Sequence, residues 1–402
     1  MAIEKLAGNL RKMAAIRFLS CTYLISSVLI PFFREWGRLS FTAILVLQAW
    51  FMIWSFLLEV PTGAVADRFG RKISIAAGGM VACCASLLYA SSPSLTVFFA
   101  AEWLGACAIA LFSGADEALV YDTLKALGRA GEATPVISRL ESFKLAGIVA
   151  GAISGGLVAA WAGVRAPMFF QAVPLGLSGL LALSLVEPPC SEGMNRPAST
   201  SYLGVLLGGM AYLRRNSELH RLVLDMVTNG MVAWLVLWLY QPQLQRVGIP
   251  LAAFGAVHSG ISLVQIAVLT RVEQLERLLG GRRRLWQITA LIPPLCYLAL
   301  WVTTNPALSI ALILIASACG LARPPLFSGA FNNLIPSERR ATVLSAISAT
   351  RTLGIGLLYP VVGAILDRSL PWTFAFLGVL GLMATFCSAV SIPSSSDTVP
   401  KD

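Results

Sequence analysis

Long apolar runs separated by short charged breaks constrain the fold of this 402-residue chain more than any other feature. Residues 41–61 contain Glu59 as their only charge, and residues 73–90 contain no charge at all. At roughly 1.5 Å of rise per residue, each run is long enough to cross a hydrocarbon core of about 30 Å. The compact charged stretch between them, residues 59–72, is therefore predicted to be a tight turn between two membrane helices.

The composition extends this interpretation to the whole chain. Hydrophobic residues make up 57% of it and charged residues 12%, whereas soluble domains contain about 25% charged residues. Because backbone groups in a bilayer must be satisfied within their own helix, we predict an all-α membrane protein with twelve transmembrane helices. The first run lacks a small-residue cleavage site and is expected to be a retained helix. The predicted spans are residues 14–33, 41–61, 73–91, 95–115, 140–162, 166–186, 221–241, 251–270, 285–304, 306–328, 341–363 and 372–392.

The formal net charge of +10 follows the membrane topology and does not indicate nucleic-acid binding. If the N-terminus lies inside, most basic residues fall in cytoplasmic segments. The predicted outer loops then contain only Arg34, Arg38, Arg165, Arg246 and Arg368. This asymmetry obeys the positive-inside rule, so both termini are predicted to be cytoplasmic in a cytoplasmic (inner) membrane.

Several function classes are disfavoured by what the chain lacks. The eight cysteines lie mostly within predicted spans without metal-ligand spacing, and they are interpreted as packing residues. With only His220 and His258, neither a histidine-rich metal site nor a Ser/His/Asp triad is expected. No nucleotide-binding Gly-rich loop ending in Lys-Ser or Lys-Thr is present. We therefore expect no cofactor, no metal and no enzyme activity.

The chain is predicted to consist of two pseudo-symmetric six-helix halves. Residues 1–190 form the first, and residues 220–402 form the second with a short tail. Residues 191–219 are a cytoplasmic linker, of which 202–219 form an amphipathic helix on the membrane surface or a short core helix. An offset of 207 residues pairs Val136 with Val343, Gly147 with Gly354 and Gly156 with Gly363. A parallel six-plus-six repeat is an architecture of secondary transporters.

The stretch Gly63-Ala-Val-Ala-Asp67-Arg68-Phe-Gly70-Arg71-Lys72 resembles the best-known motif of the major facilitator superfamily. Its glycines permit a tight turn, and Asp67 is an anion that can meet a helix N-terminus. The resemblance implies that Asp67 faces the start of the eleventh helix near Ala341. It also implies that Arg71 pairs with an acid at the inner end of the fourth helix and so latches the inner side. The candidate acids are Asp116, Glu117 and Asp122. The alternative is an ordinary charged topogenic loop.

A second resemblance lies in the fifth span, Gly147-x-x-x-Gly151-Ala152-x-x-Gly155-Gly156, which is similar to the family's antiporter motif with Ala152 in place of a proline. It implies export in exchange for protons, whereas generic small-residue packing is the alternative. Many proton-coupled exporters of the family carry an arginine in the fourth helix. Here that stretch is Ala101-Glu102-Trp103-Leu104-Gly105, so arginine-assisted coupling does not transfer.

Charged and aromatic residues within the spans are the remaining candidates. Glu102 is a candidate site for a proton or a cationic substrate, or else a carboxyl that reaches the outer headgroups. Asp225 and Asn229 give the seventh helix a polar face that lines a cavity or forms an interhelical hydrogen bond. Glu59 is expected to pair with a nearby arginine, or else to take part in transport chemistry.

Two further groups each have two interpretations. One group is an aromatic substrate wall, or else packing and lipid-facing side chains: Trp103, Trp234, Trp238 and Tyr240. The other consists of basic residues at inner helix ends, which snorkel or form a gating pair between the halves: Lys144, Arg323 and Arg351.

Taken together, these features predict a monomeric secondary active transporter that works by alternating access in the lipid bilayer. Proton-coupled export of a small amphiphilic drug or metabolite is the primary hypothesis, which makes the chain an efflux antiporter. The alternatives are a metabolite importer or uniporter, and a non-transporting assembly factor or receptor on the same scaffold.

Overall fold

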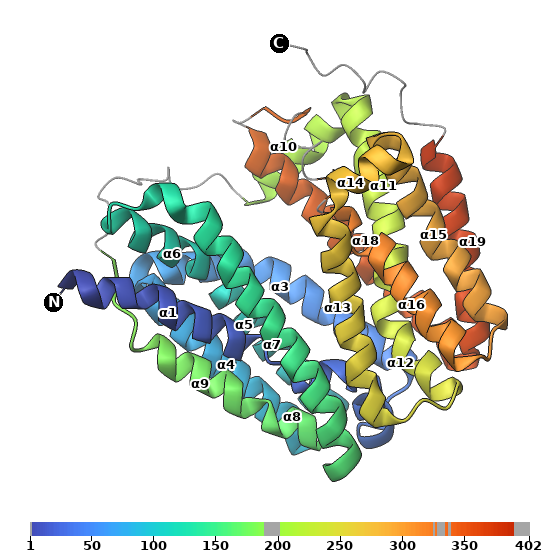
Figure 1. Cartoon of the computed structure of the whole chain (residues 1–402), viewed down its shortest axis with the longest axis horizontal. Helices are drawn as coiled ribbons and strands as arrows, with labels where there is room; N and C mark the ends of the chain where they lie inside the picture. Colours follow the sequence, from blue (N-terminus) through green and yellow to red (C-terminus); the bar gives the residue numbers. More distant parts are fainter. Residues whose placement is uncertain (1, 189–201, 325, 328–333, 337–338, 390–402) are drawn as a thin grey trace. The chain divides into compact units, whose positions relative to one another are not determined.

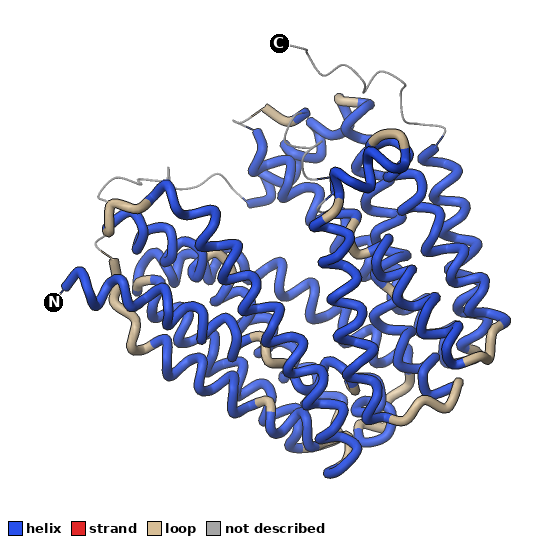
Figure 2. The backbone as a smooth tube through the Cα atoms, in the orientation of Figure 1, coloured by secondary structure: helices blue, strands red, loops and turns tan. Residues whose placement is uncertain are grey.

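The computed structural model describes residues 2–188, 202–324, 326–327, 334–336 and 339–389. Within these ranges every segment is helix, turn or loop, and no strand occurs (Figure 2). Figure 1 labels the helices. Contacts divide the chain into two compact units. Unit 1 contains the described residues of Met1–Asn195 together with Ile249–Ser262 and Tyr359–Ala364, and unit 2 contains the rest of the described chain.

The first of these units is built from twelve labelled elements of the N-terminal half, followed by η4. They are α1 (Ala2–Ser20), η1 (Leu24–Ser27), α2 (Leu29–Pro31), η2 (Phe32–Trp36), α3 (Phe41–Phe69), α4 (Arg71–Ser91), α5 (Leu95–Phe112), α6 (Ala115–Ala126), η3 (Ala130–Glu132), α7 (Ala133–Ala162), α8 (Ala166–Phe170), α9 (Ala172–Ala182) and η4 (Leu251–Ala253).

Unit 2 is built from the helices of the C-terminal half, and α13 and α18 contribute residues to both units. The elements are α10 (Tyr202–Arg215), α11 (Ser217–Trp234), α12 (Val236–Arg246), α13 (Phe254–Thr270), α14 (Val272–Leu279), α15 (Arg282–Val302), α16 (Pro306–Gly320), α18 (Arg340–Arg368) and α19 (Leu370–Ala389).

Each predicted span overlaps one or more helices of the described chain. Within the described ranges, nine helical segments are long and apolar enough to cross a membrane, and residues Leu6–Ser27 and Leu29–Trp36 form a tenth span that is bent by 61°. Two shorter apolar helices, Ala166–Ala182 and Pro306–Gly320, correspond to the sixth and tenth predicted spans. The described residues are therefore consistent with the predicted all-α, twelve-helix protein.

The first span is bent, where the sequence predicts one continuous helix. The bend follows Thr22, whose hydroxyl donates to the backbone oxygen of Phe18 at 2.7 Å, and Tyr23 then adopts an extended conformation. A threonine that bonds back to its own helix competes with the backbone ladder and often bends the chain. The bend turns Tyr23 and Ile25 toward a cavity described below.

Unit 1 extends beyond the predicted first half because two glycines of the C-terminal sequence pack against it. A Cβ atom added to Gly255 would clash with the backbone oxygen of Ala152, and one added to Gly363 would lie 2.6 Å from the Cα of Thr42. These close approaches bring Ile249–Ser262 and Tyr359–Ala364 into unit 1. Residues 191–201 of the predicted linker lie outside the described residues.

The helix α10 that follows the linker packs on the core of unit 2. Leu213 is buried in a cluster with Leu219 and Val343, and a Cβ on Gly209 would lie 2.5 Å from the backbone oxygen of Thr342. This packing favours the short core helix over a helix that only rests on the membrane surface.

Candidate functional site

The charged stretch 59–72 is mostly helix and not a loop. Helix α3 continues to Phe69, and α4 begins at Arg71, so Gly70 alone makes the turn. Its φ of 94° lies in the region that glycine tolerates and side chains avoid. Gly63 does not contribute to a tight turn, because it lies within α3 and a Cβ there would meet no atom within 4 Å. The prediction that both glycines form the turn was therefore wrong for Gly63.

The turn is closed by Glu187, a residue that the sequence interpretation missed. Its carboxylate oxygens accept hydrogen bonds from the backbone N–H of Arg71 at 2.8 Å and of Lys72 at 3.0 Å. These are unsatisfied donors at the N-terminus of α4, where a negative charge is favourable. The available signal was an isolated acid directly after the apolar run 166–186.

The structure places Arg71 against one of its three candidate acids. The Arg71 guanidinium forms an ion pair with Asp122 and also donates to the backbone oxygen of Ala118 at 2.5 Å. Asp67 and Arg68 are exposed, and the Arg68 guanidinium lies 5.6 Å from the Phe69 ring centroid. The contact expected for Asp67 involves the start of α18 in the other unit, so it stays a prediction.

The other two candidate acids face Arg17 instead. The Arg17 Nη2 lies 2.8 Å from Asp116 and 3.9 Å from Glu117, and Nη1 forms an ion pair with Glu141. Lys144 lies 3.1 Å from Glu141 and is about 40% exposed. Arg17 is 6% exposed and is missing from the sequence-based candidates, although it is the only charge in the predicted span 14–33.

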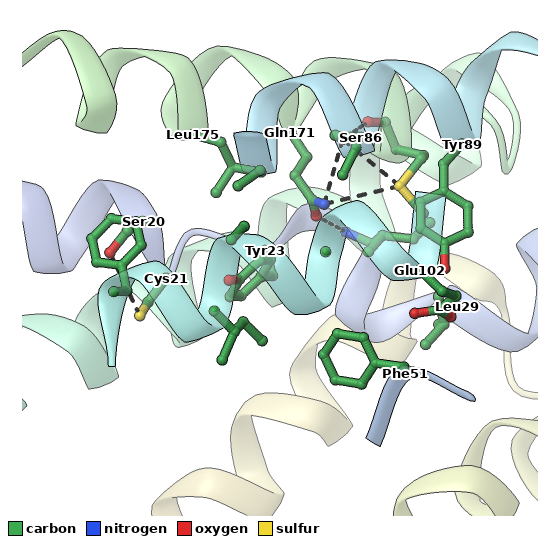
Figure 3. Close-up of a pocket in the computed structure, with 18 of the residues that line it drawn as sticks. Ser20, Cys21, Tyr23, Leu29, Phe51, Ser86, Tyr89, Glu102, Gln171 and Leu175 are labelled. Atoms are coloured by element: carbon green, nitrogen blue, oxygen red, sulfur yellow. Dashed lines mark hydrogen bonds between the residues drawn. The ribbon is translucent and has the colours of Figure 1, made fainter. Parts of the chain in front are cut away.

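A cavity of about 460 Å³ runs through unit 1 between these charges and Glu102. Arg17, Asp116 and Lys144 line it, and so do aromatic side chains such as Phe51. Figure 3 shows Ser20 and Cys21 at one end, Gln171 and Ser86 in the middle, and Tyr89 beside Glu102 at the other end. All of its lining residues belong to unit 1.

Glu102 is buried at its end of this cavity and does not extend toward a headgroup region. It is 5% exposed, accepts a hydrogen bond from Gln48 Nε2 at 2.5 Å, and lies beside Tyr89 (Figure 3). Within the described part of the chain, no basic side chain forms an ion pair with it. The polar side chains next to this carboxyl, Gln48 and Tyr89, are therefore neutral.

The middle of the cavity carries a polar group that the sequence interpretation also missed. The Gln171 amide oxygen accepts from the backbone N–H of Ile25 at 3.2 Å, and its Nε2 lies 3.5 Å from the Ser86 hydroxyl. The Ser86 hydroxyl donates to the backbone oxygen of Met168 at 2.5 Å. These contacts join the bent first span to α4 and the break between α8 and α9 (Figure 3).

The predicted aromatic wall does not belong to this cavity. Trp103 is 40% exposed, is absent from the cavity lining, and packs edge-on against Trp54 with ring centroids 6.4 Å apart. Trp234, Trp238 and Tyr240 lie in unit 2, where Trp234 is 41% exposed and Tyr240 is buried beside Gln241. One residue of the α5 pair Glu102 and Trp103 thus faces the cavity, and the other faces away.

Unit 2 contains a second buried ion pair, between Asp225 of α11 and Arg323 just after α16. The Arg323 Nη2 lies 2.5 Å from Asp225, and their side chains are 0% and 3% exposed. Arg323 also donates to the backbone oxygen of Trp286 at 2.8 Å and to the Thr289 hydroxyl at 3.1 Å. Arg323 therefore does not snorkel, because partners inside unit 2 satisfy its charge.

The polar face predicted on α11 takes part in this network. Asn229 Nδ2 donates to Asp225 at 2.8 Å, and the Asn229 side-chain oxygen accepts from the Thr385 hydroxyl at 3.0 Å. This geometry is the interhelical hydrogen bond that the sequence left as one of two interpretations. Arg351 is exposed, which is compatible with snorkelling, so its role stays a prediction. Glu59 differs from the expectation, because it is exposed and forms no ion pair with a described arginine.

The glycine pattern of α7 lies against the bent first span. A Cβ on Gly147 or Gly155 would clash with the backbone oxygens of Phe18 and Leu24, respectively. A Cβ on Gly151 would lie 2.6 Å from the backbone nitrogen of Tyr23. The fourth glycine, Gly156, faces η4. These positions are occupied by glycine because two backbones approach each other there.

Comparisons with known proteins agree with this architecture. The family model of the Major Facilitator Superfamily matches residues 13–291, which is more than half of the chain. The chain belongs to the Major Facilitator Superfamily. It is therefore a membrane transporter and not an enzyme.

Solved structures of the superfamily cover nearly the whole chain at low identity. The nucleoside transporter NupG aligns with a TM-score of 0.78 and 13% identity, covering 95% of this chain and 98% of that one. A bacterial homolog of the human lysosomal transporter Spinster aligns with a TM-score of 0.70 and 15% identity, covering 96% of this chain and 95% of that one. A POT family transporter in complex with a thioalcohol-conjugated peptide aligns with 0.72 and 14%, covering 95% of each chain. A search of curated protein sequences found no match.

Proposed function

We propose that this transporter is a proton-coupled exporter of a small amphiphilic organic molecule, with Glu102 as the group that takes up and releases the proton. The observation that carries the proposal is the burial of Glu102 against two neutral polar side chains, Gln48 and Tyr89. An ionised carboxylate at membrane depth is costly without a cationic partner. Such a carboxyl is stable when it holds a proton or faces a cationic part of a substrate.

The shape and lining of the cavity support the choice of an amphiphilic substrate. Apolar and aromatic side chains form most of its wall, among them Phe51, Phe112 and Leu175, while the Glu102 carboxyl lies at one end and the charged cluster around Arg17 at the other. A mainly apolar site with a few polar groups is the usual design of a small-molecule site. In this proposal the substrate binds in the cavity between Glu102 and the charged cluster around Arg17.

The turn at Gly70 is proposed to be an inner latch. The ion pair of Arg71 with Asp122 and the capping of α4 by Glu187 hold the turn in place. Asp67 is proposed to meet the N-terminal end of α18 in one state of the transport cycle and to leave it in the other. The latch then governs movement and not substrate choice.

The export direction rests on the glycine pattern of α7 and on its resemblance to the antiporter motif. Gly147, Gly151 and Gly155 fit against the backbone of the bent first span, as a packing motif requires. We further propose that the protein acts as a monomer in the cytoplasmic membrane with both termini in the cytoplasm. Import or uniport of a metabolite is the second candidate, and the folds shared with a nucleoside transporter and a peptide-bound POT transporter favour it.

Flux measurements in liposomes test the role of Glu102. Purified protein is reconstituted with a pH-sensitive dye inside, and nucleosides, dipeptides and amphiphilic amines are added in turn. We expect proton movement with at least one amphiphilic compound, and we expect Glu102→Gln to abolish it because the amide cannot release a proton. The same variant should retain substrate exchange without a pH gradient, since the cavity keeps its shape.

Glu59→Gln is the matched control, because Glu59 is an acid in the neighbouring span that is exposed and outside the cavity lining. It should leave proton movement unchanged. Flux that is indifferent to a pH gradient would exclude proton coupling. Binding of a compound without any flux would favour the non-transporting alternative.

A further inference from the structure

A second hollow of unit 1 lies between α1 and α7 and is separate from the cavity around Glu102. It has a volume of about 750 Å³. The two helices that form it pack side by side (Figure 1). Its wall consists of Leu10, Arg11, Ala14, Ala15, Phe18, Leu19, Arg129, Val136, Arg139, Leu140 and Phe143, which we call the α1–α7 groove.

The groove and the cavity lie along different faces of α1. Arg17 and Ser20 line the cavity, whereas Ala14 and Phe18 line the groove. No residue is shared between the two linings. A ligand in the groove would therefore not occupy the proposed substrate site.

The groove is apolar along most of its length and basic at one end. Ala14, Phe18, Leu140 and Phe143 lie within the runs 14–33 and 140–162 that are long enough to span a membrane. Arg11 and Arg139 lie just outside these runs, three residues and one residue before their starts. The apolar part is therefore at hydrocarbon depth and the basic end at headgroup depth.

Arginines from three separate segments converge on this end. Arg11 comes from α1, Arg129 from the connection after α6, and Arg139 from α7. Arg11 and Arg139 are exposed and form no ion pair with a described residue, whereas Arg129 is held by Glu132 through hydrogen bonds of 2.8 and 2.6 Å. With Glu132 counted, the end retains two uncompensated positive charges.

We infer that the α1–α7 groove binds an anionic glycerophospholipid, with its phosphate at Arg11 and Arg139 and an acyl chain along the apolar wall. Guanidinium groups bind phosphate oxygens through paired N–H donors. Basic pockets between membrane helices are suited to anionic headgroups. The basic end of the groove fits an anionic headgroup, and the apolar remainder fits an acyl chain. A lipid has both parts.

Binding of the lipid would brace α1 against α7 on the side opposite the cavity. The backbone oxygen of Phe18 already lies so close to Gly147 that a Cβ there would clash. Phe18 itself lines the groove. An acyl chain packed on this wall would support the close helix contact that also positions Arg17.

The test uses delipidated full-length protein in detergent and native mass spectrometry with palmitoyl-oleoyl phosphatidylglycerol or phosphatidylcholine. We expect the phosphatidylglycerol to remain bound and to raise the melting temperature, with phosphatidylcholine retained much less. Arg11→Gln/Arg139→Gln should weaken phosphatidylglycerol binding roughly 30-fold, because each basic residue contributes about a factor of five. Without added lipid, the variant should melt like the native protein because both side chains are exposed.

Arg214→Gln/Arg215→Gln is the matched control, since it removes two exposed arginines of α10 in the other unit. It should bind phosphatidylglycerol like the native protein. A second variant, Ala15→Trp, fills the apolar wall at an exposed position and keeps the arginines. It should weaken binding as well.

Three results would overturn the inference. Equal weakening in the α10 control would mean that only diffuse charge attracts the lipid. Full binding by Ala15→Trp would place the acyl chain elsewhere. Competition by inorganic phosphate or glycerol phosphate at the same concentration as the lipid would indicate a site for free anions. Transport does not enter any of these measurements, so failure of the proposed function would leave them interpretable.

Discussion

Each unit contains an ion pair at a matching position of the internal repeat, but the acid and the arginine have exchanged places between the two units. In unit 1 the arginine is on the first span and the acid follows the fourth, as Arg17 and Asp116. In unit 2 the acid is on the seventh span and the arginine follows the tenth, as Asp225 and Arg323. Asp116 and Arg323 are 207 residues apart, the offset of the internal repeat. Each charge finds its partner inside its own unit.

The two pairs differ in their surroundings. The Asp225–Arg323 pair is sealed, with side-chain exposures of 3% and 0%, and the Arg323 Nη1 donates to two neutral groups. The Arg17–Asp116 pair borders the cavity, with exposures of 7% and 15%, and Arg17 also contacts Glu141. At this position of the repeat, unit 2 therefore has a buried ion pair that joins helices (the clasp), whereas in unit 1 the ion pair forms part of a cavity wall.

Breaking the sealed pair should have the largest effect on stability. Asp225→Asn leaves the Arg323 charge buried without compensation, and we expect a loss of about 3–5 kcal/mol in the free energy of unfolding. Thermal and denaturant unfolding in detergent would measure it. The double variant Asp225→Leu/Arg323→Met should recover most of the loss, because it removes both charges. If Asp225→Asn melted like the native protein, the clasp would have no structural role.

Breaking the pair beside the cavity should cost less stability and more function. In Arg17→Gln the two acids Asp116 and Glu141 lose their arginine, but they are already partly exposed and lie near Lys144. We therefore expect a loss of roughly 1–3 kcal/mol in the free energy of unfolding. Substrate binding, measured by thermal shift with a transported compound, should weaken because the wall of the cavity changes its charge. A destabilisation larger than that of Asp225→Asn would reverse the comparison.

The smallest effect is expected at the rim of the same cluster. Lys144 and Glu141 form a pair three residues apart on α7 with side-chain exposures of 40% and 38%, and such pairs contribute little. Lys144→Gln should change the free energy of unfolding by less than about 0.5 kcal/mol. Its effect on substrate binding reports whether the positive charge that lines the cavity matters. Arg351→Gln, an exposed basic residue on α18, is the matched control.

The helices could be predicted from the sequence because bilayer thickness fixes their length, and polar breaks mark their ends. For example, the predicted span 73–91 coincides with α4 to within a few residues. The predicted span 41–61 begins where α3 begins, but α3 continues beyond the apolar run to Phe69. That continuation was missed because a membrane helix does not need to end where its apolar surface ends.

The choice of ion-pair partners could not be predicted, because it depends on a break in the fourth span. Helix α5 ends at Phe112, and Gly114 has a φ of 75°, so α6 starts with a new direction. Helical periodicity carried across the break assigns the wrong faces to the acids that follow it. Asp122 therefore reaches Arg71, while Asp116 turns toward Arg17, which is 99 residues away in sequence.

Glu102 could be identified from its type and depth alone, because an isolated acid in an apolar run is unusual in a membrane protein. Its polar neighbours could not be identified, because Gln48 and Tyr89 come from two other spans. Gln171 is similar, since its partners lie on the bent first span and on α4. The geometry of a bundle, and not local sequence, brings such groups together.

Helices α3 and α4 are connected by Gly70 alone, so no flexible loop separates their movements. Any swing of α3 during a transport cycle must carry α4 with it, so this helical hairpin should act as one stiff lever. The carboxylate of Glu187 would then connect that lever to the end of the sixth span through two backbone N–H groups. Insertion of even a short flexible segment after Gly70 would disconnect the helices mechanically while leaving every membrane span in place.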